Sequence, residues 1–292
     1  MLLHDLDEKG LLDAPKWLAD NCPYLCRMGS DAYGVSEDGS DSDMYGYVFP
    51  PKGMVFPHLE GEILGFGRHK NRFEQWQQHH VIDNDKQYDF SIYSIVKYFS
   101  LCMENNPNMI DSLFVPRECI VHITPIGNLI RENRGLFLHK GSYHKFLGYA
   151  HSMLHKIRVK TPEKGSKRSV LIEKYGFDVK YAYHLVRLCN ECEQILSTGD
   201  LDLRKGNEQL KAIRRGEMTE KQIVEWFSEQ EKTLEVLYRD SALRNVPDEP
   251  SIKALLVKCL GLHYGDLSNC VVDTDKYHKA VEDIRKILDN VK

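Results

Sequence analysis

The sequence pattern changes about halfway along the chain, and this change limits the possible folds more than any single motif. The first part has short runs of β-branched and aromatic residues cut by Gly and Pro, as in MYGYVFPPKG (44–53) and ECIVHITPIG (118–127). The later part has few prolines and repeats its apolar residues at the 3.6-residue helical spacing. Short strands followed by long helices predict an α+β domain over 1–135 and an all-helical domain over 136–292.

The same patterns locate the expected elements. We expect a first helix over 11–20, strands over 24–28, 41–49, 63–66, 73–77 and 121–123, and a strand end at 88–90 that leads into a helix over 92–104. The expected helices of the second domain span 142–158, 178–197, 206–215, 219–241, 250–262 and 274–290. Asp178 and Thr219 are expected to cap helix starts, and Gly199 and Gly216 to end helices.

Charge and cysteine content exclude several classes of protein. Asp and Glu total 43 against 39 Lys and Arg, so the net charge of -4 excludes a protein that coats nucleic acid through overall positive charge. No apolar run approaches the roughly 18 residues of a membrane span, and the N-terminus lacks the features of a secretory signal. The pair Cys189 and Cys192 lies in an expected helix without a second pair nearby, which favours buried reduced thiols over a zinc site. We therefore expect a cytoplasmic protein.

The acidic stretch DGSDSDMYG (38–46) contains the first candidate site residues. Asp41 and Asp43 lie two positions apart on an expected strand, so their side chains leave the same face. Adjacent like charges repel each other unless a cation lies between them, and hard oxygen ligands suit Mg²⁺. A solvated acidic turn is the alternative, because this composition is also typical of loops.

Gly29 and Ser30 form a second candidate feature, a turn that follows the expected strand over 24–28. A glycine lets the backbone approach a ligand closely, and free N–H groups at such a turn can bind an anion. A turn for phosphates close to paired carboxylates for metal ions matches the needs of a nucleoside triphosphate. Taken alone, Gly29 and Ser30 are also typical of an ordinary tight turn.

These motifs resemble those of a known family. GSDAYG (29–34) followed by SDSDMYG (40–46) is similar to the nucleotidyltransferases of the DNA polymerase β superfamily, and specifically to their RlaP-type branch. The resemblance extends from about residue 23 to residue 265. Its further segments are YDF (88–90), Asn106-Pro107, FLGYAH (146–151), KYAYHLVRL (180–188) and LKAIRRGE (210–217).

The resemblance implies a polymerase-β-like catalytic domain, a mixed sheet with flanking helices, over 1–135. The helical domain over 136–292 would then close the nucleotide cleft. It also implies that Asp89, on a neighbouring strand, completes a metal site with Asp41 and Asp43 for two Mg²⁺ ions, with Mn²⁺ as the alternative ion. A helix N-cap is the other interpretation of Asp89.

Basic residues on an expected helix complete the candidate site. Lys180, His184 and Arg187 fall at i, i+4 and i+7, on one face of the helix over 178–197. Arg and Lys bind phosphate oxygens, and the resemblance implies that this face lines the nucleotide cleft. A solvated helix face, or a His184 packed in the core, is the alternative. The basic stretch over 156–168 is expected to be a loop that either orders on phosphates or is a solvated linker.

Together these features predict an Mg²⁺-dependent nucleotidyltransferase. It would transfer NMP from an NTP to an acceptor hydroxyl and release pyrophosphate. Gly29 and Ser30 would bind the β- and γ-phosphates, with Lys180, His184 and Arg187 also on the nucleotide. The resemblance implies an RNA or other nucleic-acid end as the acceptor, through its association with RNA repair. The alternatives are transfer of AMP to a partner protein and a non-catalytic nucleotide- or RNA-binding module of the same fold.

Overall fold

The computed structural model describes residues 1–36, 41–56, 72–159, 165, 167–265, 284 and 288. These residues contain a five-stranded mixed sheet with the strand order β3-β4-β2-β1-β5. Only β2 and β4 run parallel to each other among its neighbouring pairs. The strands are β1 (Tyr24–Arg27), β2 (Ser42–Val48), β3 (Gln75–Asp83), β4 (Lys86–Ser94) and β5 (Ile120–Ile123).

The sheet is covered on both faces because its side chains alternate between two apolar clusters. Leu25, Met44 and Val48 pack in one cluster with the helix α1 (Leu2–Glu8). Tyr24 and Tyr47 belong to the other and larger cluster, together with residues of the helices that flank the opposite face. The remaining helices of the first part are α2 (Lys52–Val55), α3 (Ile95–Met103), α4 (Pro107–Phe114) and α5 (Pro125–Glu132), with 3₁₀ turns at Arg117–Cys119 and Arg134–Phe137.

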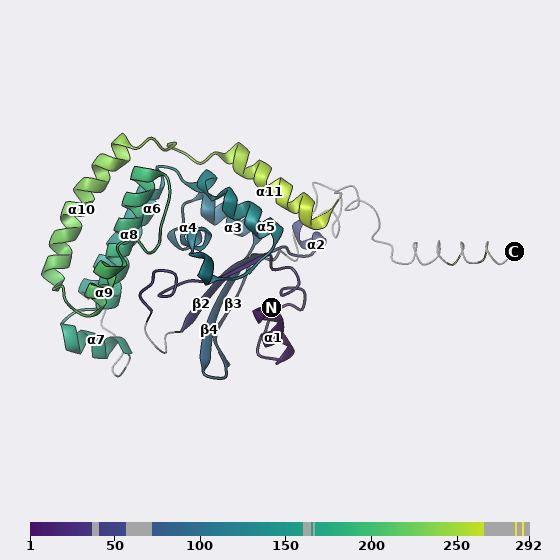
Figure 1. The fold of residues 1–292 in the computed structure, drawn as a ribbon, viewed down its shortest axis with the longest axis horizontal. Coiled ribbons are helices and arrows are strands. Elements are labelled where there is room, and N and C mark those ends of the chain that lie inside the picture. The colour runs from purple at the N-terminus through teal and green to yellow at the C-terminus, as the bar shows by residue number, and fades with distance from the viewer. Residues whose placement is uncertain are drawn as a thin grey trace.

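The second part of the described chain is helical and curves back to the sheet. The helices α6 and α8 pack together, α10 lies outermost against them, and α11 returns across α3 and α5 (Figure 1). The Tyr264 hydroxyl at the end of α11 donates a hydrogen bond to the Pro50 carbonyl, next to β2. These helices are α6 (Ser142–Val159), α7 (Lys167–Tyr175), α8 (Val179–Thr198), α9 (Asn207–Arg214), α10 (Glu220–Asp240) and α11 (Glu249–Tyr264).

The larger apolar cluster is continuous between the sheet and the helical part. It includes Tyr24 and Tyr47 from the strands, Phe146 from α6, Leu185 from α8 and Leu255 from α11. Burial of this apolar surface therefore joins the two parts directly. A division of the chain at 135–136 stays a prediction.

Most expected elements are confirmed, and the exceptions have physical reasons. The expected helix over 11–20 is wrong: the first helix is α1, and Pro15 would stand inside the expected one, where it cannot donate a backbone hydrogen bond. The helix expected from residue 92 begins at Ile95, because β4 continues to Ser94, whose side chain accepts a hydrogen bond from the Lys97 N–H.

Besides α1, the sequence pattern does not predict the helices α2, α4, α5 and α7. They are only 4, 8, 8 and 9 residues long, too short to show a clear helical repeat. The strand expected over 73–77 is β3, displaced towards the C-terminus. The strand expected over 63–66 lies outside the described residues, as does almost all of the helix expected over 274–290.

The expected helix caps are confirmed for α8 and α10. Asp178 Oδ1 accepts hydrogen bonds from the Lys180 and Tyr181 N–H groups, at 2.9 and 3.2 Å. Thr219 forms a capping box at the start of α10, and Gly199 ends α8 with a φ of 68°. Among the described helices, none is both long enough and apolar enough to cross a membrane.

We predict that Asp178→Ala lowers the free energy of unfolding by about 1–2 kcal/mol, since it removes a buried cap that satisfies two N–H groups of α8. Denaturant titration followed by circular dichroism measures this loss. Asp200→Ala is the matched control, because Asp200 lies exposed beyond the other end of α8 and should change stability by less than about 0.5 kcal/mol. Equal losses in the two variants would contradict the role given to the cap.

Candidate active site

Parallel pairing of β2 and β4 brings two of the three predicted carboxylates together. Asp43 and Asp89 are direct partners in the strand register, so both side chains leave the same face of the sheet. Asp89 therefore lies within β4, not at a helix N-cap. Asp41 precedes β2 and is exposed, whereas Asp43 is half-buried and the Asp89 side chain is 22% exposed.

The Gly29 turn lies directly against Asp43. The Met28 N–H donates a hydrogen bond of 2.7 Å to the Asp43 carbonyl, and Gly29 follows with a φ of 62°. A Cβ atom at position 29 would come within 2.2 Å of Asp43 Oδ2. Any side chain here would therefore meet both backbone strain and the carboxylate, so only glycine fits without rearrangement.

The turn that contains Gly29 and Ser30 is closed by its own hydrogen bonds. The Tyr33 N–H donates to the Gly29 carbonyl at 3.4 Å, and the Val35 N–H donates to the Ser30 carbonyl at 2.9 Å. Ser30 is half-buried at the start of this turn. The structure thus places Gly29 against the Asp43 carboxylate, with Ser30 as the next residue of the turn.

A bulge in β3 adds two histidines that the sequence pattern did not identify. The register of β3 against β4 shifts between Gln78 and Val81, and His80 within this bulge has a φ of 56°. Its N–H donates a hydrogen bond of 2.7 Å to Asp89 Oδ1, and His79 Nδ1 lies 3.8 Å from Asp89 Oδ2. The bulge therefore orients the Asp89 carboxylate. This contact between the β3 bulge and Asp89 depends on the register of β3 with β4, which a single sequence does not show.

The nearby carboxylates give the candidate site an excess of negative charge. Burial raises the pKa of Asp43 above its usual range, and the nearby charges of Asp89 and Asp41 raise it further. Lys180 and His79 act in the opposite direction but do not cancel these effects. Two facing carboxylates without a full countercharge are a suitable place for a divalent cation.

Magnesium fits this donor set. Within the described residues no group of three or more His, Cys, Asp and Glu side chains gathers closely enough to hold a metal ion. Magnesium, however, usually needs only one or two carboxylates and takes its other ligands from water and substrate phosphates. Asp43 and Asp89 supply two, and the exposed Asp41 lies two residues before Asp43, at the start of β2.

The basic residues predicted on α8 do not all face the carboxylates. Lys180 is exposed in the first turn, close enough to lower the pKa of Asp43. Burial lowers the pKa of His184 well below its usual range, and the positive charges of Arg187 and Lys180 lower it further. His184 is therefore a neutral imidazole next to cations at neutral pH.

Arg187 lies deeper than the other two residues and is already paired. Its side chain is only 6% exposed and forms ion pairs with Asp111 at 2.5 Å and with Glu191 at 2.9 Å. The structure thus brings Lys180 near Asp43 but holds the Arg187 guanidinium in a separate buried network. Direct binding of nucleotide by Lys180, His184 and Arg187 stays a prediction.

The basic stretch over 156–168 is only partly described, because residues 160–164 and 166 lie outside the described ranges. Its last residues are helical, since α7 begins at Lys167. The Arg168 guanidinium lies 4.1 Å from the centre of the Tyr181 ring, and Lys156 Nζ lies 5.6 Å from it. Two cations from this stretch therefore pack beside the start of α8.

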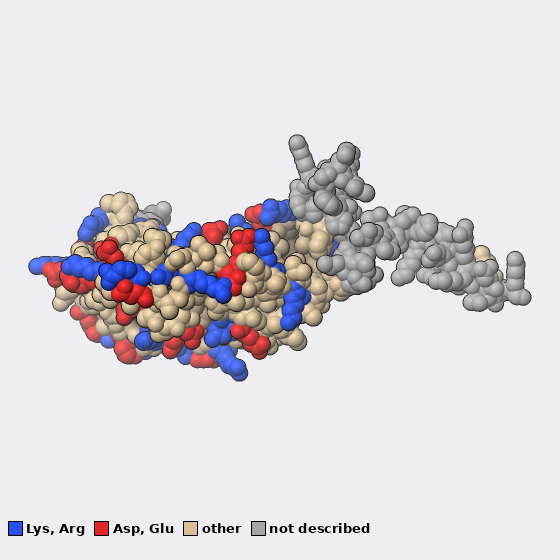
Figure 2. Space-filling model, turned by 90° about the horizontal axis from the view of Figure 1, so that it is seen from above, with Lys and Arg blue, Asp and Glu red and all other residues tan. Residues whose placement is uncertain are grey.

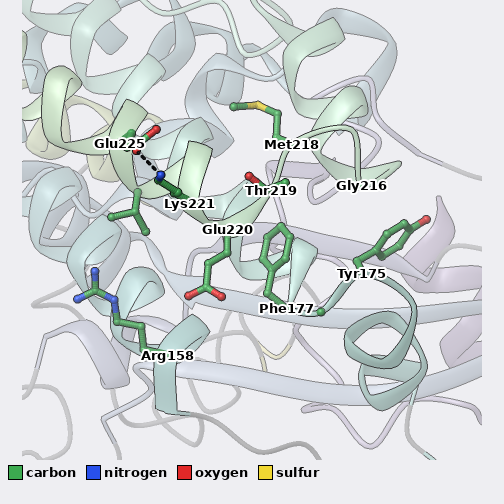
Figure 3. A pocket seen from close by; sticks show the side chains of 11 residues that line it. Arg158, Tyr175, Phe177, Gly216, Met218, Thr219, Glu220, Lys221 and Glu225 are labelled. Atoms are coloured by element: carbon green, nitrogen blue, oxygen red, sulfur yellow. Dashed lines mark ion pairs between the residues drawn. The ribbon is translucent and has the colours of Figure 1, made fainter.

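The charge distribution on the surface and two cavities describe the surroundings of the candidate site. Lys and Arg are interspersed with Asp and Glu on the face in Figure 2, so this described face shows no large patch of one sign. A cavity of about 700 Å³ includes Asp41 in its lining, together with Arg27, Lys86 and Tyr88. A second cavity, of about 690 Å³, lies between the start of α10 and the Tyr175–Phe177 segment and contains none of the predicted site residues (Figure 3).

Comparison with known proteins identifies one matching family. The RlaP family model, described as the RNA repair pathway DNA polymerase beta family, matches residues 13–253. The crystal structure of a nucleotidyltransferase-like protein from Exiguobacterium sibiricum 255-15 aligns with 88% of this chain and 71% of its own. The two chains are 10% identical, with a TM-score of 0.30. No curated protein matches the chain.

We predict that Gly29→Ala lowers the free energy of unfolding about twice as much as Gly10→Ala, since only position 29 forces the Asp43 carboxylate to move. Gly10 has a similar φ of 69° but open space around its Cα, so its substitution costs about 1–2 kcal/mol of backbone strain alone. Urea unfolding of the two variants gives the comparison. Equal losses would show that Gly29 does not lie against Asp43.

We predict that Asp43→Asn reduces the pH dependence of stability in metal-free buffer. An aspartate whose pKa is raised in the folded protein stabilises it below the ordinary aspartate pKa, and this contribution is lost as the pH rises through the raised value. Asp43→Asn removes the titrating carboxyl group, so the stability should fall less as the pH rises. Denaturant unfolding between pH 4 and pH 8 measures it, and Asp200→Asn, an exposed site beyond the end of α8, is the control.

The same two variants test metal binding. Mg²⁺ should raise the melting temperature of the unmodified protein and of Asp200→Asn, by mass action on the folded state, and should raise that of Asp43→Asn less. An equal response of all three proteins would place the cation elsewhere.

Proposed function

Because the chain belongs to the RlaP family, the RNA repair pathway DNA polymerase beta family, we propose that it transfers NMP from an NTP to an RNA end. Membership of this family makes it a nucleotidyltransferase of the polymerase-β type. The observation that carries this proposal is the pairing of Asp43 with Asp89 across β2 and β4, next to a glycine turn that admits no side chain. Carboxylates beside an anion-binding turn are what phosphoryl transfer with a divalent cation requires.

Each residue has a distinct part in the proposed reaction. Asp43 and Asp89 hold Mg²⁺ together with Asp41. When bound, the ion lowers the pKa of the acceptor hydroxyl and offsets negative charge on the α-phosphate. The acceptor hydroxyl releases its proton to water as its oxygen forms a bond to the α-phosphorus, the bond to the bridging oxygen breaks, and pyrophosphate leaves.

The turn and the start of α8 bind the triphosphate in this proposal. Gly29 and Ser30 present backbone N–H groups to the β- and γ-phosphates. Among the predicted basic residues, Lys180 is the one whose charge lowers the pKa of Asp43. In this proposal it balances negative charge on the departing pyrophosphate. His184 is held neutral by its surroundings, so it contributes a hydrogen bond and not a charge.

The cavity beside Asp41 supports a nucleic-acid acceptor. Its lining combines the cations Arg27 and Lys86 and the ring of Tyr88 with the carboxylates of Asp41 and Asp85, and it does not include Asp43 or Asp89. Cations that contact phosphates and an aromatic ring that stacks on a base are the usual parts of a site for a single-stranded end. The protein's net charge of -4 and the mixed charges on the face in Figure 2 favour this kind of local contact over binding along a whole duplex.

We predict that α-labelled NTP and Mg²⁺ transfer label to RNA, and that Asp43→Asn or Asp89→Asn lowers the rate by about a thousandfold, since each removes a metal ligand. Incubation with each of the four NTPs, a pool of short RNAs and a cell extract measures the transfer. Asp240→Asn should retain the full rate, because Asp240 lies exposed at the end of α10.

The competing functions have separate outcomes in this assay. Label on protein instead of RNA would indicate transfer of AMP to a partner. NTP binding without transfer to any acceptor would indicate a binding module. Transfer that survives Asp43→Asn and Asp89→Asn would contradict the assignment of the carboxylates.

A further inference from the structure

Within the described residues, three arginines that lie far along the chain donate hydrogen bonds to the segment 31–35, which closes the Gly29–Ser30 turn. Arg187 Nη1 donates to the Tyr33 hydroxyl at 2.7 Å, Arg204 Nη2 to the Asp31 carbonyl at 3.4 Å, and Arg214 Nη1 to the Val35 carbonyl at 2.6 Å. These arginines come from α8, the turn before α9, and α9. We call them the arginine clamp.

The contact between Arg187 and Tyr33 is the most deeply buried part of the clamp. Tyr33 is 3% exposed, and its hydroxyl accepts from Arg187 and donates to Asp111 Oδ2 at 2.7 Å. The Arg187 guanidinium also lies 4.2 Å from the centre of the Tyr33 ring. Asp111 lies on α4, so Tyr33 is fixed between α4 and α8.

Arg187 is poorly placed to leave this network and contact a phosphate. Its Nη1 atom donates to both Asp111 and Glu191, whose side chains are 0% and 3% exposed. Movement of the guanidinium would leave these two carboxylates buried without their cation, which is strongly unfavourable. The network therefore favours a permanent structural contact with Tyr33.

Arg204 and Arg214 hold the rest of the segment against α9. Arg204 also pairs with Glu118 at 2.5 Å, which fixes its guanidinium. Gly34 has a φ of 66°, and a Cβ there would come within 3.2 Å of the Asn207 side chain at the start of α9. The segment after the turn is therefore closely packed as well as hydrogen-bonded.

We propose that Arg187 and Arg214 are positioning residues for the nucleotide: they hold the segment Tyr33–Val35, and so aim the Gly29 and Ser30 N–H groups at the triphosphate, without contacting phosphate themselves. This inference rests on the proposed function of the turn. Its physical basis is preorganisation, because a turn that is ordered before binding loses less entropy when the nucleotide arrives. The helical part thereby sets nucleotide affinity through the backbone of the first part.

The first test replaces Tyr33 with Phe, which removes the hydroxyl between Arg187 and Asp111 but keeps the ring and every charge. We expect the NTP KM to rise about tenfold, the usual scale for a lost hydrogen bond to a charged group, while kcat changes less than about twofold. Amide hydrogen exchange of residues 30–35, measured without nucleotide, should become faster. Direct phosphate binding by Arg187 predicts no change in either quantity.

The second test compares adjacent arginines at the end of α9. Arg214→Gln should raise the NTP KM and speed exchange in residues 30–35, as in Tyr33→Phe. Arg215→Gln is the matched control, because Arg215 is 54% exposed and bonds to Glu217 instead of the turn. A raised KM in Arg214→Gln with unchanged exchange would overturn the proposal, because it would indicate contact with the nucleotide.

Hydrogen exchange separates failure of this inference from failure of the proposed function. If the protein transfers no nucleotide but exchange increases in Tyr33→Phe and Arg214→Gln, the clamp exists and the proposed function is lost. In that case the Kd for NTP replaces KM, and an unchanged Kd in both variants would overturn the positioning role. Unchanged exchange in both variants would overturn the clamp itself.

Discussion

The parallel pairing of β2 with β4 is the contact on which the rest of the site depends. It places Asp43 opposite Asp89, and two carboxylates this close repel each other in a partly buried setting. The surrounding structure orients both groups: the Asp43 carboxylate lies against the Gly29 turn, and the Asp89 carboxylate accepts from the His80 N–H. The backbone has a positive φ at both Gly29 and His80, a conformation that is ordinary for glycine but uncommon for histidine, next to these two carboxylates.

The helical part acts on this site by two different routes. Lys180, at the start of α8, acts directly through its charge on Asp43. Arg187, two turns further along the same helix, acts through Tyr33 and so through the backbone of the turn. A stripe of basic residues on one helix face is therefore divided between the surface and the interior. Lys180 is the exposed residue in a first turn that is otherwise buried, whereas Arg187 lies in the buried middle of α8.

The sequence predicted the parts of the site that depend on local spacing. The Gly29 turn and the cap at Asp178 are local patterns that lie where the sequence indicated, and Asp43 lies on β2, whereas Asp41 precedes that strand. The partnership of His80 with Asp89 needs the register of two strands, and that of Arg187 with Asp111 needs the packing of α4 on α8. Such long-range contacts leave no periodic signal in one sequence, so the basic face of α8 was interpreted as uniform.

The return of α11 to the sheet limits how the helical part can move relative to the sheet. The helical part begins at α6, and α11 packs on α3 and α5 and bonds to Pro50. A segment attached at both ends cannot swing about a single hinge as a free lid does. Under the proposed function, entry of a nucleotide and release of pyrophosphate would then require small shear movements between α8 and the Gly29–Val35 segment. The closed and open forms would thus differ by sliding of packed helices, with the common core intact.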